Sequence, residues 1–150
     1  MTEEPLLEIC SLDVGFAAYG LTAQVLHGVD LRVKAGQRVA VIGESGSGKT
    51  VTMKTVIGTL PHPAGRVLGG SIRFQGREMV GAPPRELLKV RGNRVSMIFQ
   101  EPMTSLNPLH TIEKQIAEIL LLHKGMTGKA ARDRIVALLD QVGKIGRAHV

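Results

Sequence analysis

Residues 38–50 have the sequence RVAVIGESGSGKT, in which a short apolar run passes directly into a glycine-rich loop. The run Arg38–Ile42 is rich in β-branched residues and predicts a buried parallel strand. The segment Val51–Leu60 carries apolar residues at helical spacing and predicts a helix, which we expect to end at Pro61 and Pro63. A strand, a loop and a helix in this order predict an α/β fold.

The loop fits the pattern G-x-x-x-x-G-K-[ST] at every position. Phosphate oxygens need several donors in a small volume, and backbone N–H groups at a strand-to-helix turn supply them, helped by the positive end of the helix. Side chains would block this approach, which explains the glycines. Lys49 is placed to contact the β- and γ-phosphates, and the Thr50 hydroxyl is placed to bind Mg²⁺. The expected nucleotide-binding residues are Gly43, Glu44, Ser45, Gly46, Ser47, Gly48, Lys49 and Thr50.

Composition narrows the class of protein. The chain has 150 residues, 43% of them hydrophobic, which suits one globular domain and excludes disorder. We expect no membrane span and no secretory signal, because the apolar runs are short and Glu3 and Glu4 follow Met1. Cys10, the one cysteine, is expected to be a small core residue, and the sequence favours a reducing, cytoplasmic setting.

The chain is basic, with a formal net charge of +6 and a pI near 9.9. No long run of Lys and Arg is present, and aromatic residues make up only 3% of the chain. We therefore interpret the charge as an ordinary basic surface and expect no direct nucleic-acid partner. Arg91 and Arg94 are likewise expected on a solvated face rather than against an acidic partner.

The remaining segments complete the expected element order. Loose alternation and β-branched residues predict strands, and apolar residues at helical spacing predict helices. Ala35-Gly36 is expected to form a turn. Strands are expected at Leu6–Phe16, Val25–Val33, Ser71–Phe74 and Val95–Phe99, and helices at Pro84–Val90, Ile112–Leu120 and Ala131–Val142.

Two further strings carry a family resemblance. Met97-Ile98-Phe99-Gln100 resembles the Q-loop of the ATP-binding subunits of ATP-binding cassette (ABC) transporters. The continuation EPMTSLNP, residues 101–108, is similar to the branch that imports dipeptides, oligopeptides or nickel. GESGSGKTV and LLDQVG are similar to the same branch, and the resemblance runs from about Leu6 to Gly143.

The resemblance implies a three-layer P-loop NTPase (RecA-like) core with a small antiparallel β subdomain and the start of a helical subdomain. It implies that residues 1–99 form the core and β subdomain, and that 100–143 form the Q-loop and the helical part. Gly43–Thr50 corresponds to the Walker A loop. Gln100 corresponds to the Q-loop residue, which meets Mg²⁺ and the attacking water and acts in catalysis with Lys49. Tyr19 lies where the family stacks an aromatic ring on adenine.

The function implied by the resemblance is ATP hydrolysis that drives import of peptides or nickel. The cofactors would be ATP and Mg²⁺, and the protein would sit peripherally on the cytoplasmic face of the cell membrane. The implied partners are transmembrane permease subunits, a second ATPase subunit in a homo- or heterodimer and, indirectly, a solute-binding protein. The transported solute is not encoded in this chain.

The family's signature loop, Walker B strand, D-loop and switch histidine have no counterpart after Gln100. The sequence therefore favours an N-terminal fragment that does not turn over ATP at a useful rate by itself. Residues 144–150 break the resemblance, and their codons can be written as those of a sequencing adapter. We interpret this tail as non-native, with a divergent native tail as the alternative.

Two other function classes stay open. A soluble ABC-type ATPase of DNA repair or translation is favoured by the basic charge and disfavoured by the PMTSLNP string. A P-loop nucleotide kinase would need a lid with clustered arginines after the loop, whereas residues 61–94 carry only scattered ones.

Overall fold

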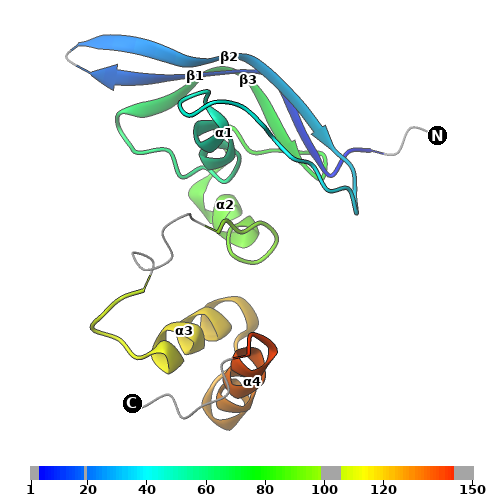
Figure 1. Ribbon diagram of the computed structural model, residues 1–150, viewed down its shortest axis with the longest axis vertical. Coiled ribbons are helices and arrows are strands. Elements are labelled where there is room, and N and C mark those ends of the chain that lie inside the picture. The colour runs from blue at the N-terminus through cyan, green and yellow to red at the C-terminus, as the bar shows by residue number, and fades with distance from the viewer. Residues whose placement is uncertain (1–3, 19, 99–105, 144–150) are drawn as a thin grey trace. The chain divides into compact units, whose positions relative to one another are not determined.

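The computed structural model describes residues 4–18, 20–98 and 106–143. These residues form two compact units that divide between Val95 and Ser96 (Figure 1). Tyr19, Gln100 and the tail 144–150 lie outside the described residues, so the expectations for them remain predictions.

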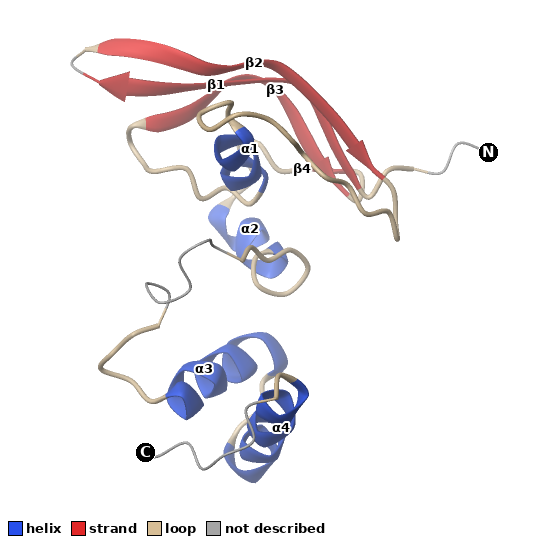
Figure 2. Ribbon diagram, viewed as in Figure 1, coloured by secondary structure: helices blue, strands red, loops and turns tan. Residues whose placement is uncertain are grey.

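The first unit is built on a four-stranded antiparallel sheet with strand order β2-β1-β3-β4 (Figure 2). Its long strands are β1 (Leu7–Ala18), β2 (Leu21–Val33) and β3 (Gly65–Phe74), and β4 (Arg77–Glu78) is a short edge. The expected strands at the N-terminus are confirmed. β3 begins six residues before the expected Ser71, because its glycine-rich first half pairs with β1 in spite of its low strand propensity.

A change of phase in β1 is absorbed by a bulge. Ile9 is buried, and so are Leu12 and Val14, although strict alternation would put the last two on the opposite face from Ile9. Ser11 lies between Ile9 and Leu12 with φ +47°, and the pairing register with β2 shifts at this bulge. The Ser11 N–H donates to Asp30 Oδ1 at 2.8 Å, so the bulge leaves no unpaired donor.

One face of this sheet is covered by α1 (Lys49–Val56), as Figure 1 shows. Val56 from α1 is buried in the same cluster as apolar side chains from the three long strands. Burial of this kind contributes roughly 2 kcal/mol per large side chain, so the sheet and α1 stabilise each other. The fully buried members of the cluster are Ile9, Leu12, Val14 and Ile72.

α1 is shorter than the helix expected at Val51–Leu60. It ends at Val56, because Gly58 follows with φ +65° and the Thr59 N–H turns back to the Lys54 carbonyl at 2.8 Å. The glycine therefore ends the helix before the prolines are reached. α2 (Pro84–Val90) has the expected bounds, with a proline in its first turn. The Lys89 ammonium donates to Glu86 at 2.8 Å, and this hydrogen bond and charge lower the pKa of the Glu86 carboxyl.

The strands expected at Arg38–Ile42 and Val95–Phe99 are not formed over residues 38–42 and 95–98, so the prediction is wrong for these described residues. Residues 38–42 have no strand pairing, and Ile42 is 92% exposed. Val95 makes only a single bridge to Arg91, and Ile98 is 95% exposed. A buried parallel strand needs hydrogen-bonded neighbours at its edges and helices on both faces. All strand pairs of the described sheet are antiparallel, and the parallel bridge between Arg91 and Val95 is isolated, so neither apolar segment joins the sheet.

The second unit is a pair of helices, α3 (Ile112–Lys124) and α4 (Gly128–Gln141). The Thr111 hydroxyl caps α3 by accepting from the Lys114 N–H, and Gly125 ends the helix with φ +63°. Leu120, Ala131 and Ile135 form the small core, as their spacing predicts. Ile119 and Val142 are 54% and 68% exposed, so their expected place on the buried face is wrong. No helix in the described ranges is long and apolar enough to cross a membrane.

Leu12→Ala tests the core of the sheet. Because Leu12 is fully buried, we expect a loss of about 2–5 kcal/mol in the free energy of unfolding, measured by urea denaturation. Leu88→Ala is the matched control, since Leu88 on α2 is 62% exposed and should change stability by less than about 0.5 kcal/mol. Similar losses in both variants would contradict this assignment of the core.

Candidate functional site

The loop Gly43–Gly48 leads directly into α1, and the amino end of that helix has no protein cap. Gly48 is the N-cap residue and offers no side-chain hydrogen bond, and the first turn contains no acidic residue. The N–H groups of a first helical turn have no carbonyl one turn earlier to accept from them. Donors and the positive end of the helix dipole therefore converge on the concave side of the loop, as an anion requires.

Packing and backbone geometry explain two of the glycines. Gly48 has φ +91°, and a Cβ at this position would lie 2.5 Å from Leu26 Cδ2 on β2. A Cβ at Gly43 would lie 2.8 Å from Ser47 Oγ, inside the loop. Gly48 therefore lets the loop pack against the sheet, and Gly43 leaves room for the Ser47 side chain inside the loop.

A tight turn forms the middle of the loop. The Ser47 N–H donates to the Glu44 carbonyl at 3.2 Å, with Ser45 and Gly46 between them. Gly46 has φ +84°, a conformation that a residue with a side chain rarely adopts at the third position of a turn. The turn fixes the direction in which the following N–H groups point.

The Lys49 side chain folds back into the loop from the first turn of α1. Its ammonium donates to the Gly43 carbonyl at 2.7 Å, the Glu44 carbonyl at 2.6 Å and Ser47 Oγ at 3.0 Å. An ammonium has three donors, so these bonds use its full capacity. The positive charge is therefore held at the loop, beside the uncapped helix end, rather than extended into solvent.

The residues present fit a polyphosphate with a bound divalent cation. Backbone N–H groups and an ammonium are suitable donors for phosphate oxygens. Thr50 is exposed at the start of α1 and offers a hydroxyl oxygen, a ligand type that Mg²⁺ accepts. The structure thus brings Gly43 to Thr50 together at one helix end. It does not test Tyr19 or Gln100, which lie outside the described residues.

Arg91 was expected on a solvated face, and this expectation is wrong. Its side chain is half-buried against the other end of α1, where Nε donates to the Ile57 carbonyl and Nη2 donates to the Gly58 carbonyl, both at 2.6 Å. Arg94 is exposed but donates to Gln75 Oε1 at 2.8 Å. Sequence pattern does not reveal these bonds, because the partners lie 33–34 and 19 residues away along the chain.

Comparison with known protein families gives a match to the family described as ABC transporter, over residues 26–149. The chain belongs to the ABC transporter family. The match includes the whole of the loop Gly43–Thr50 and the helices α1 to α4.

Similar curated proteins are ABC transporter ATP-binding proteins of bacteria. The peptidoglycan transport ATP-binding protein YejF of Agrobacterium fabrum is 51% identical over 93% of this chain and 26% of its own length. The oligopeptide transport ATP-binding protein AppD of Bacillus subtilis is 44% identical over 92% of this chain and 42% of its own length. The chain thus spans about a quarter to two fifths of the length of these relatives.

Solved ABC cassettes share the fold. One is an ATP-binding cassette in a dimeric post-hydrolysis state bound to ADP and Pi, which matches with a TM-score of 0.77 and 21% identity over 91% of this chain and 57% of that one. The cbiO1 protein of Clostridium perfringens, part of an ABC transporter complex, matches with a TM-score of 0.65 and 20% identity over 94% of this chain and 51% of its own. These likenesses confirm the expected fold class, a P-loop α/β cassette represented here by part of its elements.

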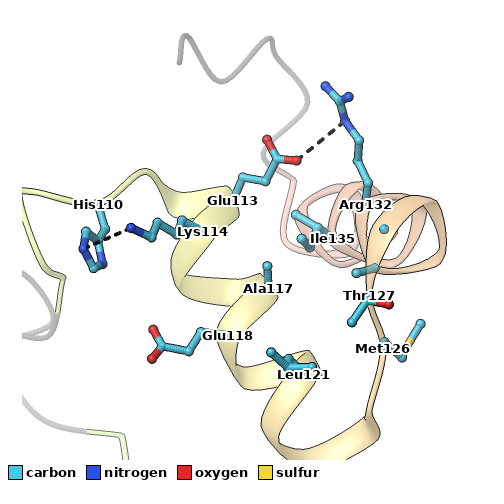
Figure 3. A pocket seen from close by; sticks show the side chains of 12 residues that line it. His110, Glu113, Lys114, Ala117, Glu118, Leu121, Met126, Thr127, Arg132 and Ile135 are labelled. Carbon is cyan, nitrogen blue, oxygen red and sulfur yellow. Dashed lines mark hydrogen bonds and ion pairs between the residues drawn. The ribbon is translucent and has the colours of Figure 1, made fainter.

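The helical unit of this ABC family member contains a separate open pocket of about 430 Å³ between α3 and α4 (Figure 3). Its floor is apolar, with Ala117, Leu121 and Ile135. At its rim, Glu113 and Arg132 approach to 3.6 Å, and the Lys114 ammonium lies 3.4 Å from His110 Nε2. These polar groups interact with one another, and the pocket contains none of the loop residues. The loop Gly43–Thr50, and not this pocket, is therefore the candidate phosphate site.

Gly48→Ala tests how the loop is held. The positive φ alone costs about 1 kcal/mol, and the clash with Leu26 adds to this, so we expect a loss of at least about 2 kcal/mol in the free energy of unfolding. Gly46→Ala is the control, because Gly46 also has a positive φ but a Cβ there meets nothing within 4 Å. Urea denaturation compares the two variants. Equal losses would show that contact with β2 does not constrain the loop.

Proposed function

We propose that this chain is the nucleotide-binding part of an ABC transporter ATPase and binds Mg-ATP at Gly43–Thr50. The observation that carries the proposal is the uncapped amino end of α1 with the Lys49 ammonium folded into the loop before it. The names of the relatives add support, since they describe ATP-binding proteins.

In this proposal the Lys49 ammonium gives up some of its hydrogen bonds to the loop and donates to phosphate oxygens instead. Its acceptors in the loop are two neutral carbonyls and one hydroxyl, and a phosphate oxygen carries negative charge. Hydrogen bonds between two charged groups are stronger than those to neutral acceptors, so the exchange favours the bound nucleotide. The first-turn N–H groups of α1 would hold the phosphates without any movement of the helix.

Thr50 is proposed to hold Mg²⁺ through its hydroxyl, together with phosphate oxygens. When bound, the cation neutralises the charge that develops on the phosphates during hydrolysis. Gln100 is proposed as a second contact to the cation and to the attacking water, and Tyr19 as the ring that stacks on adenine. Both roles rest on the family resemblance, because neither residue is among those described.

The cellular role proposed for the whole protein is ATP hydrolysis that powers import of peptides, with nickel as a less supported solute. Relatives named for oligopeptide and dipeptide transport favour this role over a soluble ABC-type ATPase or a nucleotide kinase. The partners would be permease subunits and a second ATPase subunit, and the location would be the cytoplasmic face of the membrane. Co-purification with membrane permeases separates this role from that of a soluble ATPase.

Lys49→Ala tests the nucleotide site. Loss of a charge-assisted contact to phosphate should weaken Mg-ATP binding by about 2 kcal/mol, a roughly thirtyfold rise in Kd measured by calorimetry. Lys54→Ala is the control, because Lys54 lies in the last turn of the same helix and should leave Kd nearly unchanged. An unchanged Kd for Mg-ATP in Lys49→Ala would contradict the proposal that ATP binds at this loop.

Thr50→Val tests the cation ligand, because valine keeps the shape and removes the hydroxyl. In the wild-type chain we expect Mg²⁺ to tighten ATP binding relative to binding in EDTA. In the variant this gain should shrink by about fivefold, the value of one hydrogen-bonding oxygen. Thr59→Val, beyond the far end of α1, is the control. A full Mg²⁺ effect in Thr50→Val would exclude this hydroxyl as a ligand.

A further inference from the structure

The carboxyl end of α1 is bound by a side chain from a distant part of the chain. Arg91 donates from two nitrogens of its guanidinium to the Ile57 and Gly58 carbonyls, both at 2.6 Å. Ile57 is the C-cap residue of α1, so these carbonyls lie at the negative end of the helix dipole. A Cβ at Gly58 would collide with the Arg91 guanidinium, so the glycine leaves room for this contact.

Arg91 itself belongs to a tight turn after α2. Its N–H donates to the Leu87 carbonyl at 2.9 Å, and the turn is closed by bonds from Gly92 to Val95 at 2.9 Å and from Val95 to Val90 at 3.1 Å. On its other side the turn is fixed to the sheet, because Arg94 donates to Gln75 in the β3–β4 turn. The turn Val90–Val95 therefore connects α1 with the sheet through two arginine side chains.

α1 is fixed at both ends as a consequence. It has eight residues and is about 12 Å long, too short to bend appreciably. Its amino end packs on Leu26 beside the phosphate-binding loop, and its carboxyl end is bonded to Arg91. A change in the position or stability of one end therefore acts on the other end. In the sequence, Gln100 follows Val95 by five residues.

We propose that Arg91 is a positioning residue for the nucleotide site, which couples phosphate binding at the amino end of α1 to the turn Val90–Val95 at its carboxyl end. The proposal rests on the proposed function, since it requires Mg-ATP at Gly43–Thr50. Coupling of this kind is reciprocal: if nucleotide binding stabilises the turn, the bonded turn must strengthen nucleotide binding by the same factor. Arg91 acts through the helix and touches no nucleotide.

The first experiment measures Mg-ATP affinity in the 150-residue chain by calorimetry. Arg91→Ala should raise Kd by about three- to tenfold, the size expected for coupling through a connected network. Arg91→Lys should lie between this variant and the wild type, because lysine keeps the charge but has no planar fork for two carbonyls. Arg85→Ala is the matched control, since Arg85 is an exposed arginine on the preceding helix, α2, and should leave Kd unchanged.

The second experiment separates coupling from a general loss of structure. Hydrogen exchange followed by mass spectrometry should show that saturating Mg-ATP slows exchange in two segments of the wild-type chain, 49–59 and 90–95. In Arg91→Ala, Mg-ATP should still protect residues 49–59 and should no longer protect 90–95. Circular dichroism checks that each variant is folded. If Arg91→Ala does not fold, both the affinity and the hydrogen exchange are measured on Arg91→Lys instead.

The outcomes are distinct from those that test the nucleotide site. If the wild-type chain binds Mg-ATP and the folded Arg91 variants match it in Kd and in protection of 90–95, the positioning role is overturned while the nucleotide site stands. If the wild-type chain binds no Mg-ATP, both proposals fail. A raised Kd together with selective loss of protection at 90–95 supports the coupling.

Discussion

The close packing of Gly48 on Leu26 is the constraint on which the candidate site depends. It brings the amino end of α1 against the sheet, where a Cβ at Gly48 would lie 2.5 Å from Leu26 Cδ2 and would have to displace that side chain. Once the helix is held there, its first-turn N–H groups and the folded Lys49 side chain face the same small volume. The geometry of the candidate site is thus a result of how the sheet supports one short helix.

The sheet provides that support because backbone N–H groups at its two bulges are hydrogen-bonded to side chains within the sheet. The bulge at Ser11 would leave a backbone donor unpaired, and Asp30 accepts from it at 2.8 Å. Asp13 does the same for the Gly28 N–H at 2.8 Å, where β2 has an extra residue relative to β1. The bulges keep Ile9, Leu12 and Val14 in one core, which is the surface that α1 covers. Two carboxylates in the sheet therefore contribute indirectly to the position of the loop.

Two apolar segments, residues 38–42 and 95–98, are not part of the described sheet. Residues 38–42 lead directly into the loop, and residues 95–98 follow in sequence the turn that Arg91 bonds to α1. Parallel strands gain their stability from neighbours on both sides, and the described sheet is antiparallel throughout. The relatives are more than twice as long as this chain.

The sequence alone determined the glycine-rich loop before α1, the bounds of α2, the N-terminal strands and most of the helical pair, because each depends on residues close together in the chain. The loop pattern specifies backbone geometry directly, and the proline of α2 marks a helix start. The early end of α1 at Gly58 also follows a local signal, whereas tertiary structure alone decided the exposure of Ile42 and Ile98 and the contact of Arg91 with α1. These features depend on hydrogen-bond partners and packing surfaces from distant segments, and local periodicity carries no information about which partners are present.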